Sequence, residues 1–360
     1  MKVLFLTKYG RQGASSRYRT LQYIPYFRQC GFECTVSPLF DDDYLRNRYS
    51  SGNRRWFHLN KAVTRRLISL VASVKYDLIF IEYEVIPYGP ALAERLLKLL
   101  KVPYVVDYDD AQFHRYDRHR NPFLRTLLRN KIKTVIAGAE LVIVGNKYLA
   151  DYVRQTNSKV ELIPTVVDLR KYKVHSIPDD DCFIVGWIGT PITASYLKEI
   201  LHPLQRFLQR CKGKLLLVGA GKIDLPGLCV EVQPWDENTE VDSMQRFDVG
   251  IMPLRDEPYE RGKCGLKLIQ YMACSRPVVA SPVGVNRSLV VDGENGFLAE
   301  NQEQWFECLQ KLHDNPTMRV EMGRKGRLLV QSQYSLEMFQ EFFLRHLTKA
   351  VLSKRDRNRP

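Results

Sequence analysis

Two lysines spaced four residues apart are the first feature of the sequence that suggests chemistry. Lys263 and Lys267 lie in the segment 260–281, which follows an apolar run and has the pattern of a helix leading into another apolar run. The spacing predicts that both lysines project from one face at the start of this helix. Free N–H groups and the positive end of the helix dipole would bind a diphosphate there, and the lysines would add charge. The alternative is a solvated helix with two surface lysines.

Three aspartates form a second candidate site. Asp107, Asp109 and Asp110 stand at the end of an apolar run, where a parallel sheet would bind ligands. Clustered carboxylates suit Mg²⁺ or Mn²⁺, so an Asp-x-Asp metal site is one interpretation. A second is that an aspartate orients or deprotonates a substrate hydroxyl. The third is that the aspartates cap the next helix.

Small residues make the loop 10–19 a third candidate site. They allow the backbone to fold closely over a ligand, and an arginine beside them adds a cation. The residues concerned are Gly13, Ala14, Ser15, Ser16 and Arg17. The alternative is that Ser15 or Ser16 caps the helix that follows.

Two glycine-containing turns in the second half of the chain are further candidates. Gly189 and Thr190 follow one predicted strand, and Gly219 and Gly221 follow the next. Glycine lets the backbone approach a phosphate closely, and a threonine hydroxyl can donate to it. A plain turn is the alternative at the first position. Asn146, at the end of a strand in the first half, is also expected at the site.

Short runs rich in Val and Ile alternate with longer helical segments along the chain, which is typical of parallel strands joined by crossover helices. A polar stretch at 175–181 separates two such series. Predicted helices lie near 17–30, 55–74, 90–101, 121–138 and 147–155, and another near 336–352. The strands predicted in the first series are Val3–Thr7, Cys34–Pro38, Leu78–Glu82, Tyr104–Asp107, Leu141–Gly145 and Val160–Pro164. Those predicted in the second are Cys182–Ile188, Leu215–Gly219, Cys229–Val232, Val249–Pro253 and, as the last core strand, Pro277–Ser281.

This alternation predicts an α/β fold of two Rossmann-like, doubly wound domains. The domains are expected at residues 1–170 and 171–340, followed by a helix and a basic tail at 341–360. Ligands of such sheets bind outside the carboxyl ends of the strands, so a cleft between the two sheets is expected to hold the substrates.

The composition is that of a globular protein with an excess of basic residues. Of its 360 residues 45% are hydrophobic, and the net charge of +14 favours phosphorylated ligands, polyanions or anionic membranes. Eight cysteines without a Cys-x-x-Cys pair predict free thiols rather than a zinc site. No apolar run is long enough for a transmembrane helix or a signal peptide, so a cytoplasmic protein is expected, peripheral on the membrane at most.

The segments 260–281 and 291–298 resemble the donor-binding signature of glycosyltransferase family 4. Tyr271-Met-Ala-Cys-Ser-Arg-Pro-Val-Val resembles the family's Ala-Met-Ala-x-Gly-x-Pro-Val-Val stretch, and the resemblance is strongest from about 183 to 300. It implies a GT-B architecture whose C-terminal helix crosses back to the N-terminal domain. It also implies a retaining, metal-independent transfer from a UDP- or GDP-sugar, with no cofactor, to a glycan or lipid-linked acceptor. The Gly-Lys-x-x-x-Lys form resembles a subgroup from polysaccharide and lipopolysaccharide clusters.

The resemblance also implies roles for single residues. Gly265 and Leu266 would contact the donor. The family has two glutamates eight positions apart, and Gly262 and Gln270 stand at these positions here. Gln270 can still hydrogen-bond the donor ribose, although without negative charge. Glu260, two residues before the first position, would reach the sugar ring from the loop.

Two other functions are open at this stage. A sugar-nucleotide 2-epimerase shares the GT-B layout and would need acid and base groups near a released nucleotide. A basic nucleic-acid-binding protein would account for the charge, but the basic stretches contain no recognisable binding module, so no nucleic-acid partner is expected.

A basic stretch in the first half suggests a membrane surface as a further partner. Between Tyr44 and Tyr76 there are eight Lys and Arg residues and no Asp or Glu. Its second half places apolar residues largely to one side: Phe57, Ala62, Val63, Leu67, Leu70 and Val71. Arg66 interrupts this stripe. Trp and Phe favour the interface and basic residues favour anionic lipid, so the stretch is predicted to dock on an anionic membrane. The alternative is that the apolar side packs on the sheet.

Overall fold

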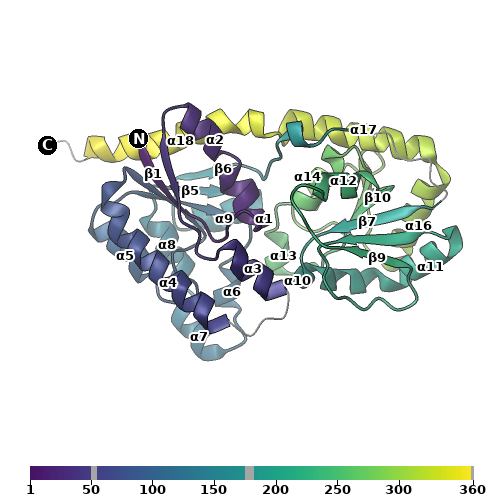
Figure 1. Cartoon of the computed structure of the whole chain (residues 1–360), viewed down its shortest axis with the longest axis horizontal. Coiled ribbons are helices and arrows are strands. Elements are labelled where there is room, and N and C mark those ends of the chain that lie inside the picture. The colour runs from purple at the N-terminus through teal and green to yellow at the C-terminus, as the bar shows by residue number, and fades with distance from the viewer. Residues whose placement is uncertain (50–54, 175–181, 358–360) are drawn as a thin grey trace. The chain divides into compact units, whose positions relative to one another are not determined.

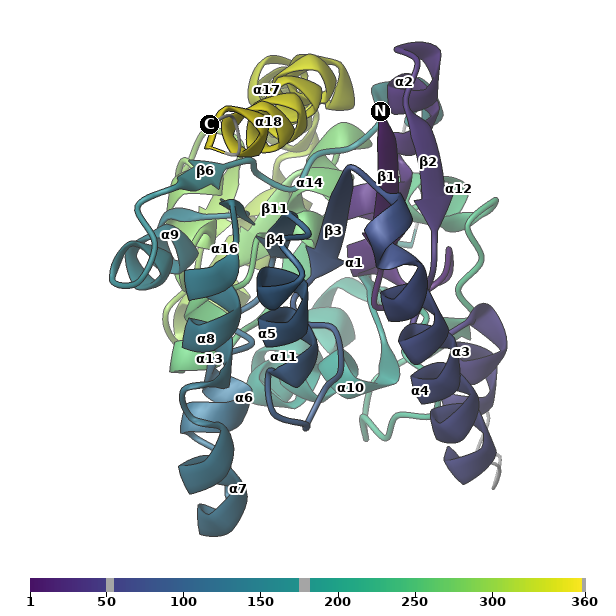
Figure 2. The ribbon, with the colours of Figure 1, turned by 90° about the vertical axis from the view of Figure 1, so that its left-hand side faces the viewer.

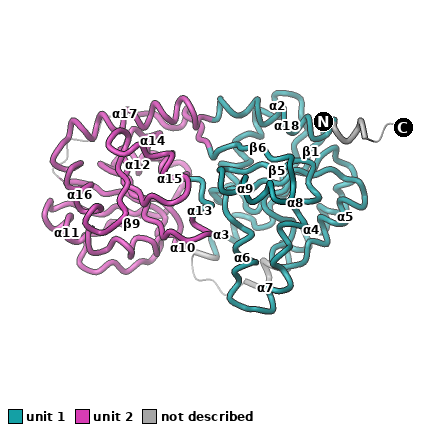
Figure 3. The backbone as a smooth tube through the Cα atoms, turned by 180° about the vertical axis from the view of Figure 1, so that it is seen from behind, with its two compact units in different colours: residues 1–165, 261–264, 336–360 teal, residues 166–260, 265–335 magenta. Residues whose placement is uncertain are grey.

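The computed structural model describes residues 1–49, 55–174 and 182–357, and the chain divides into two compact units (Figure 3). Unit 1 comprises Met1–Thr165, Arg261–Cys264 and Leu336–Pro360, and unit 2 comprises Val166–Glu260 and Gly265–Ser335. Each unit contains one six-stranded sheet in which all strands are parallel.

The sheet of unit 1 has the strand order β2-β1-β3-β4-β5-β6. Its strands β3, β4 and β5 are buried along their whole length, since helices cover both faces, and this is why they appear in the sequence as continuous apolar runs. The strands are β1 (Lys2–Leu6), β2 (Glu33–Val36), β3 (Leu78–Glu82), β4 (Tyr104–Tyr108), β5 (Leu141–Val144) and β6 (Val160–Leu162).

Helices cover the unit 1 sheet on both faces (Figures 1 and 2). The helices α4 (Arg55–Ala72), α5 (Leu92–Leu99) and α8 (Lys131–Gly138) lie on one face, and α2 (Ile24–Gln29) and α18 (Leu336–Arg357) lie on the other. The ring centroid of Phe343 in α18 lies 4.7 Å from that of Tyr23 and 5.7 Å from that of Phe80. The remaining helical segments are α1 (Ala14–Ser16), a π-helical turn η1 (Arg17–Leu21), α3 (Asp42–Tyr49), η2 (Ser73–Lys75), α6 (His114–Asp117), α7 (Pro122–Leu128) and α9 (Lys147–Arg154).

The sheet of unit 2 has the order β12-β11-β10-β7-β8-β9. Its strands are β7 (Ile184–Ile188), β8 (Lys214–Val218), β9 (Val230–Gln233), β10 (Val249–Met252), β11 (Val278–Ala280) and β12 (Gly296–Leu298). The longer helices are α11 (Leu201–Cys211), α14 (Leu266–Ala273), α16 (Gln302–Asp314) and α17 (Pro316–Gln333). The short ones are η3 (Leu169–Lys171), α10 (Pro191–Ala194), η4 (Ser195–Ile200), α12 (Glu240–Gln245), α13 (Pro258–Arg261) and α15 (Asn286–Leu289).

The fold confirms the prediction of two Rossmann-like sheets, and each predicted strand lies within two residues of an observed one. The C-terminal helix belongs to unit 1, as predicted. The prediction that Pro277–Ser281 is the last strand is wrong, because β12 pairs with β11 beyond it. Three residues starting with glycine are too few to show a strand pattern.

Two predicted helices are interrupted. The helix expected at 17–30 is a π-helical turn followed by α2, where Pro25 starts a new helix because it lacks an N–H group. The helix expected at 121–138 is divided into α7 and α8. Asn121 caps the first of these by accepting from the backbone N–H groups of Phe123 and Leu124.

Candidate active site

The two glycine turns of unit 2 meet at the carboxyl end of its sheet. Gly219 has a φ of 78°, and a Cβ on it would lie 2.4 Å from the carbonyl oxygen of Gly189. Gly221 also has a positive φ, and its missing Cβ leaves room for Pro191. Glycine is therefore required at Gly219 for both conformation and space. The predicted Thr190 side chain is engaged locally, because Thr190 and Thr193 form a capping box at the start of α10.

Lys267 extends along the same turn. Its Nζ lies 5.2 Å from the ring centroid of the buried Trp187, and a Cβ on Gly189 would come within 2.9 Å of its Cε. The helix α14 begins at Leu266, and its N-terminal position is taken by Gly265, with a φ of 68° and no side-chain cap. Lys267 thus stands in the first turn of this helix, beside the Gly189 loop, and Gly265 has no side chain to cap the leading N–H groups.

Glu260 and Gln270 are both buried in unit 2. The Tyr196 hydroxyl donates to Oε1 of Glu260, whereas Oε2 has no hydrogen-bond partner among the described residues. An unpaired buried carboxylate oxygen costs free energy unless a ligand or water satisfies it. The amide nitrogen of Gln270 lies 3.2 Å from the hydroxyl of Tyr172. Sequence reasoning missed both tyrosines, because no motif marks them.

Lys263 does not lie on the helix with Lys267, so the prediction of one shared helical face is wrong. Lys263 precedes α14 and belongs to the segment Arg261–Cys264, which is part of unit 1. Its Nζ lies 3.9 Å from a carboxylate oxygen of Asp110. The helix starts later than the spacing suggested, because Gly265 adopts the left-handed conformation immediately before it.

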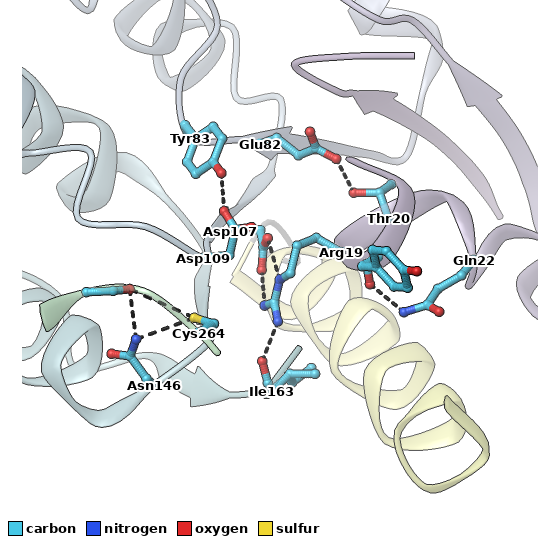
Figure 4. Close-up of polar contacts among 12 residues, drawn as sticks. Arg19, Thr20, Gln22, Glu82, Tyr83, Asp107, Asp109, Asn146, Ile163 and Cys264 are labelled. Atoms are coloured by element: carbon cyan, nitrogen blue, oxygen red, sulfur yellow. Dashed lines mark hydrogen bonds and ion pairs between the residues drawn. The ribbon is translucent and has the colours of Figure 1, made fainter. Parts of the chain in front are cut away.

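Asn146 holds this segment in unit 1. Its Nδ2 donates to the carbonyl oxygens of Gly262 at 2.9 Å and Lys263 at 3.1 Å, while its Oδ1 caps α9. Nδ2 also lies 3.4 Å from Sγ of Cys264 (Figure 4). Gly145 is needed beside it, since a Cβ there would lie 2.2 Å from Sγ of Cys264. The polar atoms of Asn146 are thus used within unit 1, and its predicted role at the substrate site stays a prediction.

The loop 10–19 is held by buried polar contacts. Ser16 donates to Glu82 at 2.5 Å and Thr20 donates to the other oxygen of this carboxylate, while the backbone N–H of Lys8 donates at 2.8 Å. Burial raises the pKa of Glu82 to about 6, although these hydrogen bonds oppose the shift. The Ser16 hydroxyl is therefore used inside unit 1, and its predicted role as a ligand contact stays a prediction. Neither Ser15 nor Ser16 caps the helix, because Gly13 occupies the cap position.

Three other predicted residues of this loop, Gly13, Ala14 and Arg17, have backbone or packing roles in the structure. A Cβ on Gly13 would lie 2.2 Å from Cβ of Tyr9, so the close fold of the loop requires glycine there. Ala14 begins the short helix α1. Arg17 is buried and donates to the backbone carbonyl oxygen of Arg11 at 3.0 Å.

Asp107 forms a buried bidentate ion pair with Arg19 (Figure 4). Its carboxylate oxygens lie 2.5 and 3.0 Å from Nη2 and Nε of Arg19, which also donates to the Ile163 carbonyl oxygen at 2.7 Å. Both side chains are at most 3% exposed. The carboxylate is thus used inside unit 1 to join β4 to the first helical turns, and a catalytic role of Asp107 stays a prediction.

Asp109 has a different environment at the same strand end. Tyr83 donates its hydroxyl hydrogen to Oδ1 of Asp109 (Figure 4). Burial, followed by the charge of the adjacent Asp110, raises the pKa of Asp109 to about 7. A carboxyl group that titrates near neutral pH can accept a proton at working pH, which is the property of a general base.

Lys8 lies on the other side of Tyr83 and was also missed by sequence reasoning. Its Nζ lies 4.7 Å from the Tyr83 ring centroid and 5.5 Å from that of Tyr9. Burial and the charge of Arg115 lower the pKa of Lys8 to about 8, against opposing effects of nearby carboxylates. A lysine directly after the first strand could have been noted, but only the fold brings it to Tyr83.

Among the described residues, no three His, Cys, Asp or Glu side chains are grouped so that they could hold a metal ion. The eight cysteines are free thiols, as predicted. Within the part of the chain that the structure describes, no helix combines the length and apolar character needed to cross a bilayer.

Comparison with known proteins identifies the central part of unit 2. Residues 182–315 match the family described as glycosyl transferases group 1. The matched range contains Gly189, Gly219, Glu260 and Lys267. We call residues 182–315, which are similar to this family, the group 1 domain. Relatives match over shorter stretches: a D-inositol 3-phosphate glycosyltransferase from an Arthrobacter species is 35% identical over 86 residues, and an uncharacterized glycosyltransferase from Methanocaldococcus jannaschii is 34% identical over 86 residues. These alignments cover 23% of this chain and only 19% and 23% of the two relatives' own lengths.

Solved structures match the fold beyond the group 1 domain. Sucrose-phosphate synthase from Thermosynechococcus elongatus superposes with a TM-score of 0.72 at 17% identity, covering 98% of this chain and 100% of that one. HepE from Anabaena, solved in complex with UDP-glucose, superposes with a TM-score of 0.70 at 16% identity, covering 97% and 100%. The fold around the group 1 domain is thus that of GT-B glycosyltransferases.

Proposed function

We propose that this protein transfers a sugar from a UDP- or GDP-sugar to a glycan or lipid-linked acceptor, with retention of configuration. The observation that carries the proposal is that the group 1 domain contains the residues that converge at the carboxyl end of the unit 2 sheet. Structural relatives that bind UDP and UDP-glucose support a nucleotide-sugar donor. The sequence resemblance favours surface polysaccharide or lipopolysaccharide assembly.

The donor diphosphate would bind at the start of α14. The first-turn N–H groups of that helix and the Lys267 ammonium lie beside the Gly189 turn. They would stabilise the charge that develops as the nucleoside diphosphate leaves. This arrangement supplies the charge neutralisation that a metal supplies in other enzymes, so we propose a reaction without a metal or a resident cofactor.

Two buried side chains would recognise the rest of the donor. Oε2 of Glu260, which lacks a hydrogen-bond partner in the described chain, would accept from a hydroxyl of the transferred sugar. Gln270 would contact the ribose with its side-chain oxygen. Its amide nitrogen is already used by Tyr172.

Asp109 in unit 1 would orient and deprotonate the acceptor hydroxyl. Its pKa is raised to about 7, whereas Asp107 is used by Arg19. The proton would move from the acceptor oxygen to a carboxylate oxygen as the new glycosidic bond forms.

The experiment is a turnover assay with UDP-glucose, UDP-galactose and GDP-mannose in the presence of EDTA, with a lipid-extract acceptor. We expect release of nucleoside diphosphate from at least one donor and little effect of EDTA. Conversion of a donor sugar into its 2-epimer would instead identify an epimerase. Loss of activity with EDTA and recovery with Mn²⁺ would contradict metal independence.

A peripheral location at an anionic membrane is the second part of the proposal. Helix α4 has two apolar stripes: Ala62 and Leu70 are buried, whereas Leu67 and Val71 are 50% and 80% exposed. Arg66, which interrupts the predicted stripe, is on the buried side.

Helix α5 also exposes apolar side chains, those of Leu92, Leu96 and Leu99. The side chains of Trp56 and Phe57 lie outside the described part of the chain. Exposed apolar residues among Lys61, Lys75 and Lys98 match the chemistry of an anionic bilayer.

A further inference from the structure

Tyr83 has a backbone conformation that its residue type disfavours. Its φ is 64°, in the left-handed region, although it is neither glycine nor asparagine. Such conformations persist only where the surroundings enforce them, and they are concentrated at functional sites. Tyr83 follows β3 directly, at the same end of the unit 1 sheet as Asp109.

The neighbours of Tyr83 enforce this conformation. On one side, Glu82 is fixed by Ser16 and Thr20. On the other side, Glu84 forms a buried ion pair with Lys131 and accepts from the Tyr116 hydroxyl at 2.6 Å. The backbone N–H of Tyr83 itself donates to the carbonyl oxygen of Asp107 at 2.9 Å. With both flanking residues fixed in the interior, the left-handed turn decides where the tyrosine side chain points.

The side chain joins two groups of opposite charge. The Tyr83 hydroxyl donates to Asp109, and the ammonium group of Lys8 lies over the Tyr83 ring (Figure 4 shows the first contact). A cation over the ring attracts the π electrons and makes the phenol a stronger hydrogen-bond donor. A hydrogen bond to a carboxylate favours its charged form. The lysine therefore acts on the carboxylate through the tyrosine.

We propose that Tyr83 is a positioning residue of the transfer reaction, which orients the Asp109 carboxylate and, with Lys8 on its ring, keeps that carboxylate ionised so that it can accept the proton of the acceptor hydroxyl. The proposal rests on the proposed function, in which Asp109 is the base. No sequence motif marks the residue.

Other charges around Asp109 act in both directions. Asp110 and Asp107 disfavour its ionised form, and Arg19 favours it. Lys263 partly offsets Asp110, to which it is paired, and Arg115 lies close to Lys8. Tyr83→Phe removes one oxygen atom and with it the hydrogen bond to Asp109. The ring under the Lys8 ammonium stays in this variant.

The test compares Tyr83→Phe with the wild type by two measurements. The first is the carboxyl ¹³C titration of Asp109, assigned with Asp109→Asn. The second is the pH dependence of nucleoside-diphosphate release from UDP-glucose and GDP-mannose. We expect the Asp109 midpoint and the acidic limb of the rate to move upward together by about one pH unit. Turnover would fall about fivefold at pH 7 and be nearly normal at pH 9.

Tyr88→Phe is the matched control. Tyr88 also has a positive φ and follows β3, but it is 55% exposed and its ring packs on Tyr116. In Tyr88→Phe we expect the Asp109 midpoint and the pH dependence of turnover to be those of the wild type. An unchanged Asp109 midpoint in an active Tyr83→Phe enzyme would overturn this proposal alone, as would equal losses at pH 7 and pH 9. A wild-type enzyme that turns over no donor would overturn the proposed function, and with it the role of Tyr83 in transfer, even if the midpoint moved.

Discussion

Arg66 of α4 donates from Nη2 to the carbonyl oxygen of Thr7 at 2.6 Å, directly after the first strand. Its Nη1 donates to the carbonyl oxygen of Ser37 at 3.1 Å, after the second strand. The side chain is 1% exposed, and burial lowers the pKa of its guanidinium to about 10. One arginine thus fixes the start of two loops at the carboxyl end of the unit 1 sheet, including the loop that carries Lys8.

Replacing this arginine should destabilise unit 1. Arg66→Met keeps most of the volume but removes two charge-assisted hydrogen bonds, and among the described residues only the Thr7 carbonyl oxygen keeps another donor, the Leu39 N–H at 2.9 Å. We therefore expect the free energy of unfolding to fall by about 2–4 kcal/mol. Urea denaturation measures the effect. The control is Arg65→Met, which removes a partly exposed pair with Asp41 and should cost about 1 kcal/mol or less. Equal losses in the two variants would contradict the role given to Arg66.

Glu82 should make the stability of unit 1 depend on pH. Its pKa of about 6 in the fold exceeds the ordinary value of 4.5, so between these pH values the folded protein holds more protons than the unfolded chain. Stability from this group is complete below pH 4.5 and falls as the pH rises through 6, by about 2 kcal/mol. Unfolding measured from pH 4 to 7 should show a smaller fall in Glu82→Gln. The same slope in both proteins would contradict the assignment.

The sequence predicted the central strands well because β3, β4 and β5 are mostly continuous apolar runs. It predicted which strand ends carry polar residues for the same reason. It missed β12, which has only three residues and begins with glycine. It did not predict which polar residues are available to substrate, because this depends on partners from distant segments. The sequence predicts a catalytic role for Asp107, and only the fold shows that Arg19, 88 residues away, pairs with it. Tyr83 carries no motif, and its importance lies in a backbone angle.

The position of Lys263 was missed for a related reason. A four-residue spacing predicts a shared face only if both residues are helical, and Gly265 delays the start of the helix. Glycine at this position is also required sterically, since a Cβ would lie 2.2 Å from Cδ1 of Leu289. This packing contact cannot be read from local sequence.

Asn146 should protect the thiol of Cys264. In the wild type Cys264 is buried, and burial raises its pKa above the ordinary range, so it should react slowly with an alkylating reagent. Asn146→Ala removes the donors to Gly262 and Lys263, and we expect the labelling rate of Cys264 to rise at least about tenfold. Peptide mass spectrometry separates it from the exposed Cys30 and Cys229.

The control for that experiment is Asn157→Ala. Asn157 also donates to two carbonyl oxygens of unit 1, those of Ile136 and Ala139, but far along the chain from the 261–264 segment. We expect no faster labelling of Cys264 in this variant. Equal acceleration in both would mean that general loosening, and not the Asn146 contacts, exposes the thiol.

The exposed stripe of α4 should matter for binding to vesicles. We expect the wild type to co-sediment with phosphatidylglycerol vesicles and less with neutral ones, and high salt should weaken binding because it screens the basic residues. Leu67→Glu with Val71→Glu should reduce the bound fraction several-fold. Val291→Glu, at a site in unit 2 that is 46% exposed, should not. Full recovery of the wild type in the supernatant under all conditions would exclude membrane docking.

The central claim is that unit 2 binds the diphosphate of a nucleotide-sugar through Lys267, and isothermal titration calorimetry of UDP and GDP tests it most directly. We predict that one of the two binds with a much higher affinity than its monophosphate, and that Lys267→Ala weakens this binding at least about tenfold, since it removes a charge-assisted contact. Lys198→Ala, an exposed lysine of the same unit, should bind as the wild type does. Binding of neither nucleotide to the wild type, or equal binding to the wild type and Lys267→Ala, would contradict the account.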